Sequence, residues 1–389
     1  MKRFRQTFQS IAASACALLV AGCAASGTVN APAAPAAPQT PEVAEAPSWE
    51  RCLPATPCSN PYPVKFVVVT MFERGELEGD QPGEFQFWKE RADLDTKIEQ
   101  PHAFEDLYLN EKTGVLGVVT GIGNIRSAAS IMALGLDQRF DLTNAYWLVA
   151  GIAGIDPEDA SIGSAVWSSH LIDGDLSHEI DAREKPEDWD FGYFPRYTQG
   201  GNTPTPREPN GEAFVANPQL RDWAFALTKD IALPDSEALQ EARSAYTEHP
   251  NAQKPPFITT GGHIAALTFW HGALLNEWAN RWVEYWSGGE TDFVTSAMEE
   301  TGTFQSIEWL HESGRVDKNR FMVLRAGSNY TMQPPGVSAA ENLLQENKGY
   351  AGFLASLESL YLVGSRVVRE ITGKWDTYRD NIPQVQKTP

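Results

Sequence analysis

The chain has 389 residues, and its 51 acidic residues against 31 basic ones give a formal net charge of −20. Hydrophobic residues make up 42% of the chain and charged residues 21%, a composition typical of a globular protein and not of a disordered or fibrous one. Nucleic-acid binding requires a basic surface, so the charge argues against a nucleic-acid partner. The one long apolar run, at 11–22, is about half of the roughly 20 residues that a membrane-spanning helix needs, which argues against an integral membrane transporter.

The first 22 residues have the parts of a secretory signal peptide, a basic start followed by an apolar segment at 11–20. The segment ends in Leu-Val-Ala-Gly-Cys at 19–23, which resembles the bacterial lipobox; the alternative is a plain signal peptide followed by a chance cysteine. The lipobox implies that Cys23 is lipidated, and Ala24 in place of an aspartate implies an anchor in the outer membrane that faces the periplasm. We therefore expect acyl chains to hold a soluble domain on a membrane surface.

We expect residues 23–60 to form a tether, because the segment is rich in Ala and Pro and this composition favours an extended chain without a core. Cys52 and Cys58 lie near its end. An oxidising periplasm allows them to form a disulfide; a metal site is the less favoured alternative, since no nearby Cys or His completes a tetrahedral set. We expect a folded domain at 61–389, with neither a metal nor a cofactor.

The folded region alternates between predicted strands and predicted helices. Short apolar runs rich in β-branched residues predict strands at 64–70, 115–120, 145–150, 163–170, 293–298 and 321–326. Apolar residues at helical spacing predict helices at 125–136, 264–282 and 349–372. The segment 181–251 is rich in Pro, Gly and aromatic residues, and we expect it to be a long insertion over the sheet. Together these elements predict an α/β fold, a three-layer sandwich with a mixed, mostly parallel sheet.

Two glycine-rich turns follow predicted strands. Gly121 and Gly123 leave the second strand, and Asn124 directly precedes the next predicted helix, while Gly151 follows the third strand. Such turns let backbone N–H groups and a helix N-terminus face an anion or a sugar hydroxyl, although a tight β–α turn alone also favours glycine. Two of them at strand ends of one sheet indicate the crevice in which α/β proteins bind ligands.

Two polar groups follow later strands. Glu299, directly after Met298 at the end of the fifth strand, can accept two hydrogen bonds from a ribose diol; an acid favoured by the helix dipole is the alternative. Asn329 lies in a polar loop predicted for 325–336, after the sixth strand. Its amide can both donate and accept, as the edge of a purine requires; an Asn that only forms a turn is the alternative, which the pattern alone slightly favours.

Aromatic residues gather at 269–286. Phe269 or Trp270 can stack on a base and His271 can bind a sugar hydroxyl; a helix core is the simpler interpretation of the tryptophans that follow at four-residue steps. The segment 178–183 lacks the second histidine of a zinc-protease helix, which argues against a metal there. The chain also has neither a Gly-x-Ser-x-Gly elbow nor a Walker loop, which argues against serine hydrolase and P-loop chemistry.

Together these segments resemble the purine nucleoside permease family. The resemblance extends from about residue 64 to the C-terminus and rests on seven motifs: FVVVTMFE at 66–73, TGIGN at 120–124, AGIAG at 150–154, EIDARE at 179–184, FWHG at 269–272, NEWANR at 276–281 and VTSAME at 294–299. The family name implies nucleoside transport. The family's pattern is in turn similar to the nucleoside phosphorylase and nucleosidase superfamily, which implies a nucleoside phosphorylase-like α/β sandwich.

The resemblance also implies roles for individual residues. Glu299 would bind ribose hydroxyls, and Gly121 and Gly123 would lie beside the pocket for the sugar or an anion. Glu73 lies near the position of the acid that activates water in nucleosidases. Asn329 stands where an aspartate commonly protonates a purine ring nitrogen; an amide cannot act as that acid, but it can hydrogen-bond to a 6-oxopurine.

We therefore expect a surface-tethered protein that binds a purine nucleoside and contributes to its uptake. Without a membrane span it would have to pass its ligand to a membrane transport component. The alternative is cleavage of the N-glycosidic bond, by a nucleosidase or a phosphorylase. Val149 and Ala150 stand where many phosphorylases have an arginine, and the net charge disfavours phosphate and nucleotides, so both observations argue against phosphorolysis. Members of the superfamily often form homo-oligomers, but the sequence does not select an oligomeric state.

Overall fold

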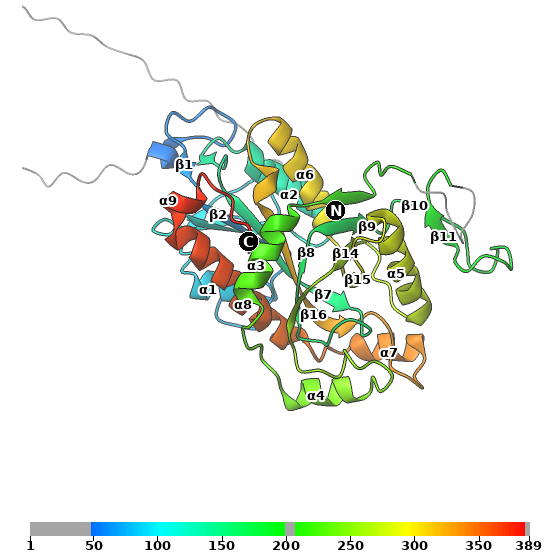
Figure 1. The fold of residues 1–389 in the computed structure, drawn as a ribbon. Helices are drawn as coiled ribbons and strands as arrows, with labels where there is room; N and C mark the ends of the chain where they lie inside the picture. Colours follow the sequence, from blue (N-terminus) through cyan, green and yellow to red (C-terminus); the bar gives the residue numbers. More distant parts are fainter. Residues whose placement is uncertain (1–47, 199–206, 386–389) are drawn as a thin grey trace, which may run out of the picture. The chain divides into compact units, whose positions relative to one another are not determined.

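The computed structural model describes residues 48–198 and 207–385 (Figure 1). These residues belong to one compact unit. Among them, no helix combines the length and the apolar character that crossing a membrane requires. The predicted signal peptide, the lipidation site at Cys23 and most of the predicted tether lie outside the described residues and stay predictions.

Parallel strands form the centre of the sheet. They are β2 (Phe66–Thr70), β5 (Val115–Val119), β7 (Tyr146–Ile155) and β16 (Phe321–Tyr330). Nearly all of their side chains are buried, because the sheet is covered on both faces, and this is why the sequence shows continuous apolar runs there. Alternate residues enter different cores: Val67 and Val69 pack on one face, and Phe66 and Val68 on the other.

The remaining strands make the sheet mixed. They are β3 (Thr96–Ile98), β4 (Leu107–Asn110), β8 (Ala165–Ser168), β9 (His170–Asp173), β12 (Ala213–Val215), β13 (Ile258–Thr260), β14 (Gly262–Ala265) and β15 (Phe293–Ala297). The order is β12-β9-β14-β15-β7-β2-β5-β4-β3; β16 pairs with both β7 and β8, and β8 also pairs with β13. β15 runs antiparallel to β7 and pairs with it at Ile155 and Gly154. The carboxyl ends of these two strands therefore lie together.

Helices cover both faces of the sheet (Figure 1). α2 (Asn124–Leu136) and α6 (Glu300–Glu312) contribute to the core around Val67. α1 (Gln86–Arg91), α3 (Pro218–Thr228) and α8 (Phe353–Gly373) contribute to the core around Phe66. α5 (Ala273–Ser287) covers β9, β14 and β15, and its tryptophans lie in a further apolar cluster. The structure thus confirms the predicted three-layer α/β fold with a mixed sheet.

The segment predicted as an insertion at 181–251 contributes to the core. Around its start, β10 (Ser177–Glu179) and β11 (Tyr193–Pro195) form a separate hairpin. α3 buries Leu220 and Ala224 against the sheet, so the segment is more than a surface loop. The other elements are η1 (Ser48–Arg51), β1 (Tyr62–Pro63), β6 (Phe140–Asp141), α4 (Glu237–Ser244), η2 (Lys318–Arg320), α7 (Ala339–Glu346) and α9 (Trp375–Tyr378).

The helix predicted over 264–282 is wrong at its start. Strand β14 occupies the first of these residues and is hydrogen-bonded between β9 and β15, and the helix begins only at Ala273. Ile264 is fully buried, so its apolar character reflects burial in a sheet and not a helical face. Gly272, with a φ of 123°, adopts a backbone conformation that favours glycine and separates the two elements.

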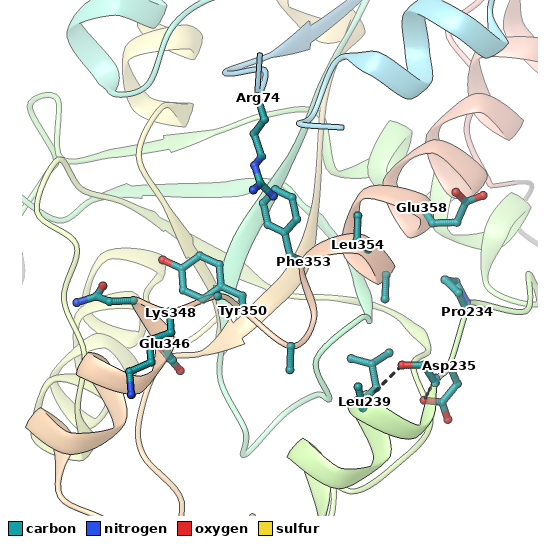
Figure 2. Close-up of a pocket in the computed structure, with 16 residues that line it drawn as sticks. Arg74, Pro234, Asp235, Leu239, Glu346, Lys348, Tyr350, Phe353, Leu354 and Glu358 are labelled. Atoms are coloured by element: carbon teal, nitrogen blue, oxygen red, sulfur yellow. Dashed lines mark hydrogen bonds between the residues drawn. The ribbon is translucent and has the colours of Figure 1, made fainter. Parts of the chain in front are cut away.

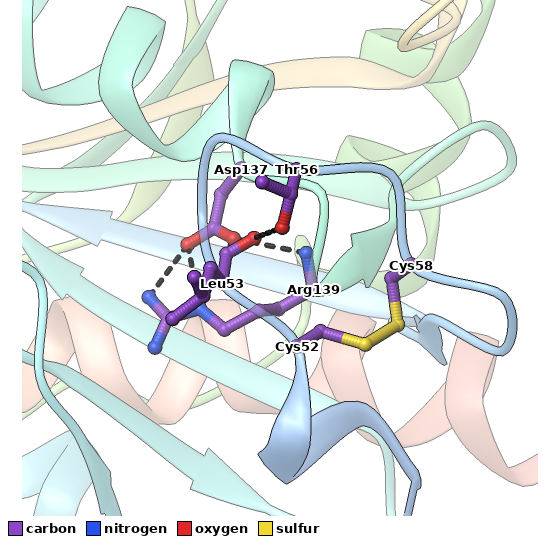
Figure 3. The surroundings of a disulfide bond; sticks show 6 residues. All are labelled: Cys52, Leu53, Thr56, Cys58, Asp137 and Arg139. Atoms are coloured by element: carbon purple, nitrogen blue, oxygen red, sulfur yellow. Dashed lines mark hydrogen bonds and ion pairs between the residues drawn. A yellow bond between two sulfur atoms is a disulfide. The ribbon is translucent and has the colours of Figure 1, made fainter.

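The structure joins Cys52 and Cys58 in a disulfide, with their Cα atoms 5.5 Å apart (Figure 3). The loop that they close is bound to the folded unit, because the backbone N–H of Gln138 donates to the carbonyl of Pro54 at 2.8 Å. The disulfide loop is therefore part of the folded unit, although we predicted it within the tether at 23–60.

Candidate functional site

A cavity of about 330 Å³ lies where the carboxyl ends of β2, β7, β15 and β16 meet. Residues at these strand ends form much of its wall, and Phe269, Tyr350 and Phe353 add aromatic rings. Its volume is at the small end of the range for ligand pockets, about 300–1,000 Å³. Two buried carboxyl groups and one buried guanidinium reach the wall, so the cavity combines aromatic surface with fixed polar groups.

Arg325 is at the centre of the charged groups, in β16, with 1% of its surface exposed. Its guanidinium forms ion pairs with Glu299, at 2.7 Å between Nη2 and Oε2, and with Glu300. Nη1 also donates to the carbonyl of Ile152 at 2.8 Å. Burial alone would lower the pKa of this guanidinium, but the carboxylates raise it above its ordinary value. Arg325 therefore stays charged and fixes both acids.

Glu299 presents a carboxylate to the cavity from the N-terminus of α6. Oε1 accepts a hydrogen bond from the backbone N–H of Gly123 at 2.9 Å. Oε2 accepts from Arg325 and, at 3.3 Å, from the backbone N–H of Met298. Burial raises the pKa of Glu299, and the charge of Arg325 opposes this shift. Because an ionised carboxylate has about four acceptor positions, one remains for a hydroxyl group of a ligand.

A second acid continues the network. Glu300 Oε2 is 2.7 Å from Nε2 of His263, whose Nδ1 is 2.9 Å from a threonine hydroxyl. Burial would raise the pKa of Glu300, but Arg325 and His263 lower it well below its usual value, so this group is ionised. The network runs from His263 through Glu300 and Arg325 to Glu299 and the N–H of Gly123. The sequence did not lead us to His263, Glu300 or Arg325. The pair of adjacent glutamates after Met298 was the one sequence feature that pointed to this network.

Glu84 also lines the cavity, and sequence analysis missed it too. Its Oε2 accepts from the backbone N–H of Met71 and its Oε1 from that of Ile152, both at 2.8 Å. Burial raises the pKa of Glu84 to about 8, although the charge of Arg325 opposes the shift. The group is therefore mainly protonated at pH 7 and can exchange a proton with a ligand near neutral pH.

Gly151 allows these groups to approach the backbone of β7. A Cβ atom at this position would overlap the side chains of Met71, Arg325 and Glu84, so only glycine fits. Gly151 itself does not line the cavity. We predicted Gly151 in a ligand-binding turn after a strand that ends at residue 150, but it lies within β7, where the packing of the charged network requires glycine.

Glu73, the predicted water-activating acid, does not line the cavity. Its carboxylate accepts hydrogen bonds from the backbone N–H groups of Phe85 and Gln86, at 3.0 and 2.7 Å, and so binds the start of α1. The catalytic role of Glu73 stays a prediction. Glu84, which follows the loop 74–83, lines the cavity in the place where we had expected Glu73.

Asn329, Met298 and Phe269 line the cavity. β16 extends beyond Asn329, so this residue lies in the strand and not in the loop that we predicted, because the strand continues to pair with β7. Its amide oxygen accepts from the hydroxyl of Ser328 at 2.9 Å, which leaves one acceptor position of this oxygen available. The ring of Phe269 is stacked with that of Tyr350 at a centroid distance of 6.4 Å.

The remaining predicted residues lie outside the cavity wall. Gly121, Asn124, Trp270 and His271 do not line it. Asn124 Oδ1 accepts from the backbone of α6 at 2.8 Å and joins α2 to that helix. Trp270 packs on the aromatic cluster beneath α5, and the side chain of His271 is buried. Binding roles for these four residues stay predictions.

Residues 63–383 match the model of the purine nucleoside permease family, and the chain belongs to this family. A purine nucleoside permease of Candida albicans is 29% identical over 322 residues, which are 81% of this chain and 76% of that protein. A probable purine nucleoside permease of Schizosaccharomyces pombe is 28% identical over 281 residues, 70% of this chain and 80% of that protein.

Solved structures of lower similarity are enzymes. A 5′-methylthioadenosine/S-adenosylhomocysteine nucleosidase from Neisseria meningitidis has 14% identity and a TM-score of 0.43, over 79% of this chain and 100% of that one. The corresponding nucleosidase of Streptococcus pneumoniae has 14% identity and a TM-score of 0.45, over 79% of this chain and 99% of that one. Likeness at this level carries no functional conclusion.

Proposed function

We propose that the protein binds a purine nucleoside in the cavity beside Arg325 and contributes to nucleoside uptake. The observation that supports this most is the carboxylate of Glu299, which Gly123 and Arg325 fix at the cavity wall with one acceptor position open. One hydroxyl group of a ribose can donate to this position. Membership in the purine nucleoside permease family points to the same ligand.

The aromatic side of the cavity suits a purine base. The side chain of Phe269 is 45% exposed, and stacking of a base on an aromatic ring contributes about 1–3 kcal/mol. The free acceptor position of Asn329 suits an N–H group on the edge of the base.

The predicted signal peptide at residues 1–22 indicates where in the cell the protein would bind its nucleoside. We propose that Cys23 carries a lipid, that the domain faces the periplasm from the outer membrane, and that it passes its nucleoside to a membrane transport component. The lipobox-like sequence at 19–23 is the support. Labelled palmitate should enter the wild-type chain and not the Cys23→Ser variant in bacterial cells; equal labelling would contradict the anchor.

Calorimetric titration of the purified protein with inosine, guanosine and adenosine tests nucleoside binding. Hypoxanthine and ribose serve as separate controls, because each occupies only one end of the proposed site. We expect at least one nucleoside to bind, and to bind more tightly than either fragment. Absence of binding with all three nucleosides would refute the proposal.

Glu84 favours a second candidate function, hydrolysis of the N-glycosidic bond. In its ionised form Glu84 can accept a proton from water while the water oxygen bonds to C1′ of the ribose. The bond from C1′ to the base breaks, the base leaves and takes up a proton, and Glu299 stabilises the positive charge that develops on the ribose. Both acids line the same cavity.

Chromatography of inosine incubated with the protein, with and without phosphate, tests this second function. Free hypoxanthine without phosphate would support hydrolysis, and a Glu84→Gln variant should then be inactive. Strict dependence on phosphate would indicate phosphorolysis instead. Intact inosine in both samples would exclude cleavage and leave binding as the function.

A further inference from the structure

A second cavity, of about 850 Å³, lies beside the one described above (Figure 2). It is formed by residues of α4, of the segment that joins α7 to α8, and of the start of α8. Tyr350 and Phe353 line both cavities, so the two are neighbours. The proposed nucleoside site does not use this space.

The acids in the wall of the second cavity are largely compensated. Asp235 accepts two hydrogen bonds from Arg243, at 2.7 and 2.9 Å, and Glu358 accepts two from Arg91, also at 2.7 and 2.9 Å. The third acid is Glu346, whose pKa burial raises to about 7, so that it carries only part of a charge at neutral pH. Little negative charge therefore faces the cavity.

The cations in the wall have no such partners. Arg74 donates to the neutral side chain of Gln81 at 3.0 Å, and its guanidinium lies over the ring of Phe353, 5.1 Å from the ring centroid (Figure 2). Lys348 also lines the cavity, and across residues 48–198 and 207–385 no acid forms an ion pair with either cation. Arg74 and Lys348 are therefore cations of this wall that no acid of the described residues neutralises, although the chain has a net charge of −20.

Phe353 connects the two sites. Phe72 lines the nucleoside cavity, and its ring lies 6.3 Å from that of Phe353. Arg74, two residues further along the chain, packs against the same ring. The two cavities therefore meet at Phe353, and Arg74 lies on the side of the second cavity.

We propose that the second cavity is a subsite for a phosphoryl group attached to the nucleoside, bound by Arg74. The inference rests on the proposed nucleoside binding. A guanidinium offers paired donors that match phosphate oxygens. The net charge of the chain does not prevent this, because exposed charges farther than about 8 Å away are screened at physiological salt. The sequence alone led us to expect a preference for unphosphorylated ligands, and this proposal differs from that expectation because no acid in the described part of the chain neutralises Arg74.

Calorimetric titration of the purified protein with inosine and with inosine 5′-monophosphate tests the subsite. We expect the monophosphate to bind more tightly. Arg74→Gln should weaken monophosphate binding about tenfold, as expected for the loss of one charge-assisted hydrogen bond, and leave inosine affinity within about twofold. Lys112→Gln is the matched control, because Lys112 is exposed in the turn between β4 and β5 and its removal changes the net charge equally; it should alter neither affinity.

Two outcomes would overturn the subsite while nucleoside binding stands. One is equal affinity for the two ligands in the wild type; the other is an Arg74→Gln variant that keeps its affinity for the monophosphate. If the protein binds inorganic phosphate but has the same affinity for the monophosphate as for inosine, the proposal that the phosphoryl group is attached to the nucleoside is also contradicted. If inosine itself does not bind, the proposed function fails together with this inference.

Discussion

Replacing Gly151 by alanine perturbs the charged network at its tightest point. The new methyl group would overlap the side chains of Met71, Arg325 and Glu84, and neither Arg325 nor Glu84 can move without losing buried hydrogen bonds. Overpacking of this kind costs about 1–3 kcal/mol of folding free energy. A displaced Arg325 would also release Glu299, so we expect nucleoside affinity to fall at least tenfold, which corresponds to about 1.4 kcal/mol.

Gly373→Ala, at the end of α8, is the control. No atom lies within 4 Å of a new Cβ there, and Gly373 is exposed and does not line the nucleoside cavity. A compatible glycine-to-alanine change alters stability by about 1 kcal/mol or less. Chemical denaturation followed by tryptophan fluorescence gives the stability of both variants, and calorimetry gives their affinity for inosine. If Gly151→Ala matches Gly373→Ala in both measurements, Gly151 does not position Arg325.

The buried acids and the cavity amide give three more predictions. Burial raises the pKa of Glu84 from 4.5 to about 8. The protonated Glu84 therefore contributes its full stabilisation below pH 4.5, and the free energy of unfolding falls by about 1.4 kcal/mol per pH unit as the pH rises to 8. Chemical denaturation between these pH values should show this additional pH dependence in the wild type and not in Glu84→Gln. Glu300→Gln removes one partner of the buried Arg325 and should cost about 3–5 kcal/mol in the same assay, whereas the exposed Glu312→Gln should cost nothing measurable. Asn329→Asp replaces an amide by an acceptor-only carboxylate. Competition calorimetry should then show that the ratio of adenosine affinity to inosine affinity rises several-fold, because the amino group of adenosine donates. An unchanged affinity ratio would mean that residue 329 does not contact the base.

The layered fold was predictable because its central strands are buried on both faces. β2 consists of apolar residues and a threonine, all buried, and such a run is distinctive in a sequence. The start of α5 was not predictable, because the short buried run around Ile264 has the same apolar character in a strand as in a helix. Only its pairing with β9 and β15 decides between the two.

The site was predictable where its residues follow strand ends. Glu299 was placed at this sheet edge in this way, since β15 meets β7; Asn329 was placed there too, although it lies within β16 and not after its end. Glu84 was missed because the loop 74–83 separates it from β2 in the sequence. Only the folded structure shows that its side chain lies at the carboxyl end of that strand. Arg325 was missed because it lies inside a buried strand, where acids distant in sequence compensate its charge.

The central claim is that a purine nucleoside binds at the carboxylate of Glu299. Titration of inosine into the wild type, Glu299→Gln and Glu312→Gln, each first shown to be folded by its denaturation curve, tests it most directly. We predict that Glu299→Gln lowers inosine affinity at least tenfold, because a charge-assisted hydrogen bond to the ribose is lost, while Glu312→Gln binds as the wild type does. A folded Glu299→Gln variant that binds inosine with unchanged affinity would contradict the claim.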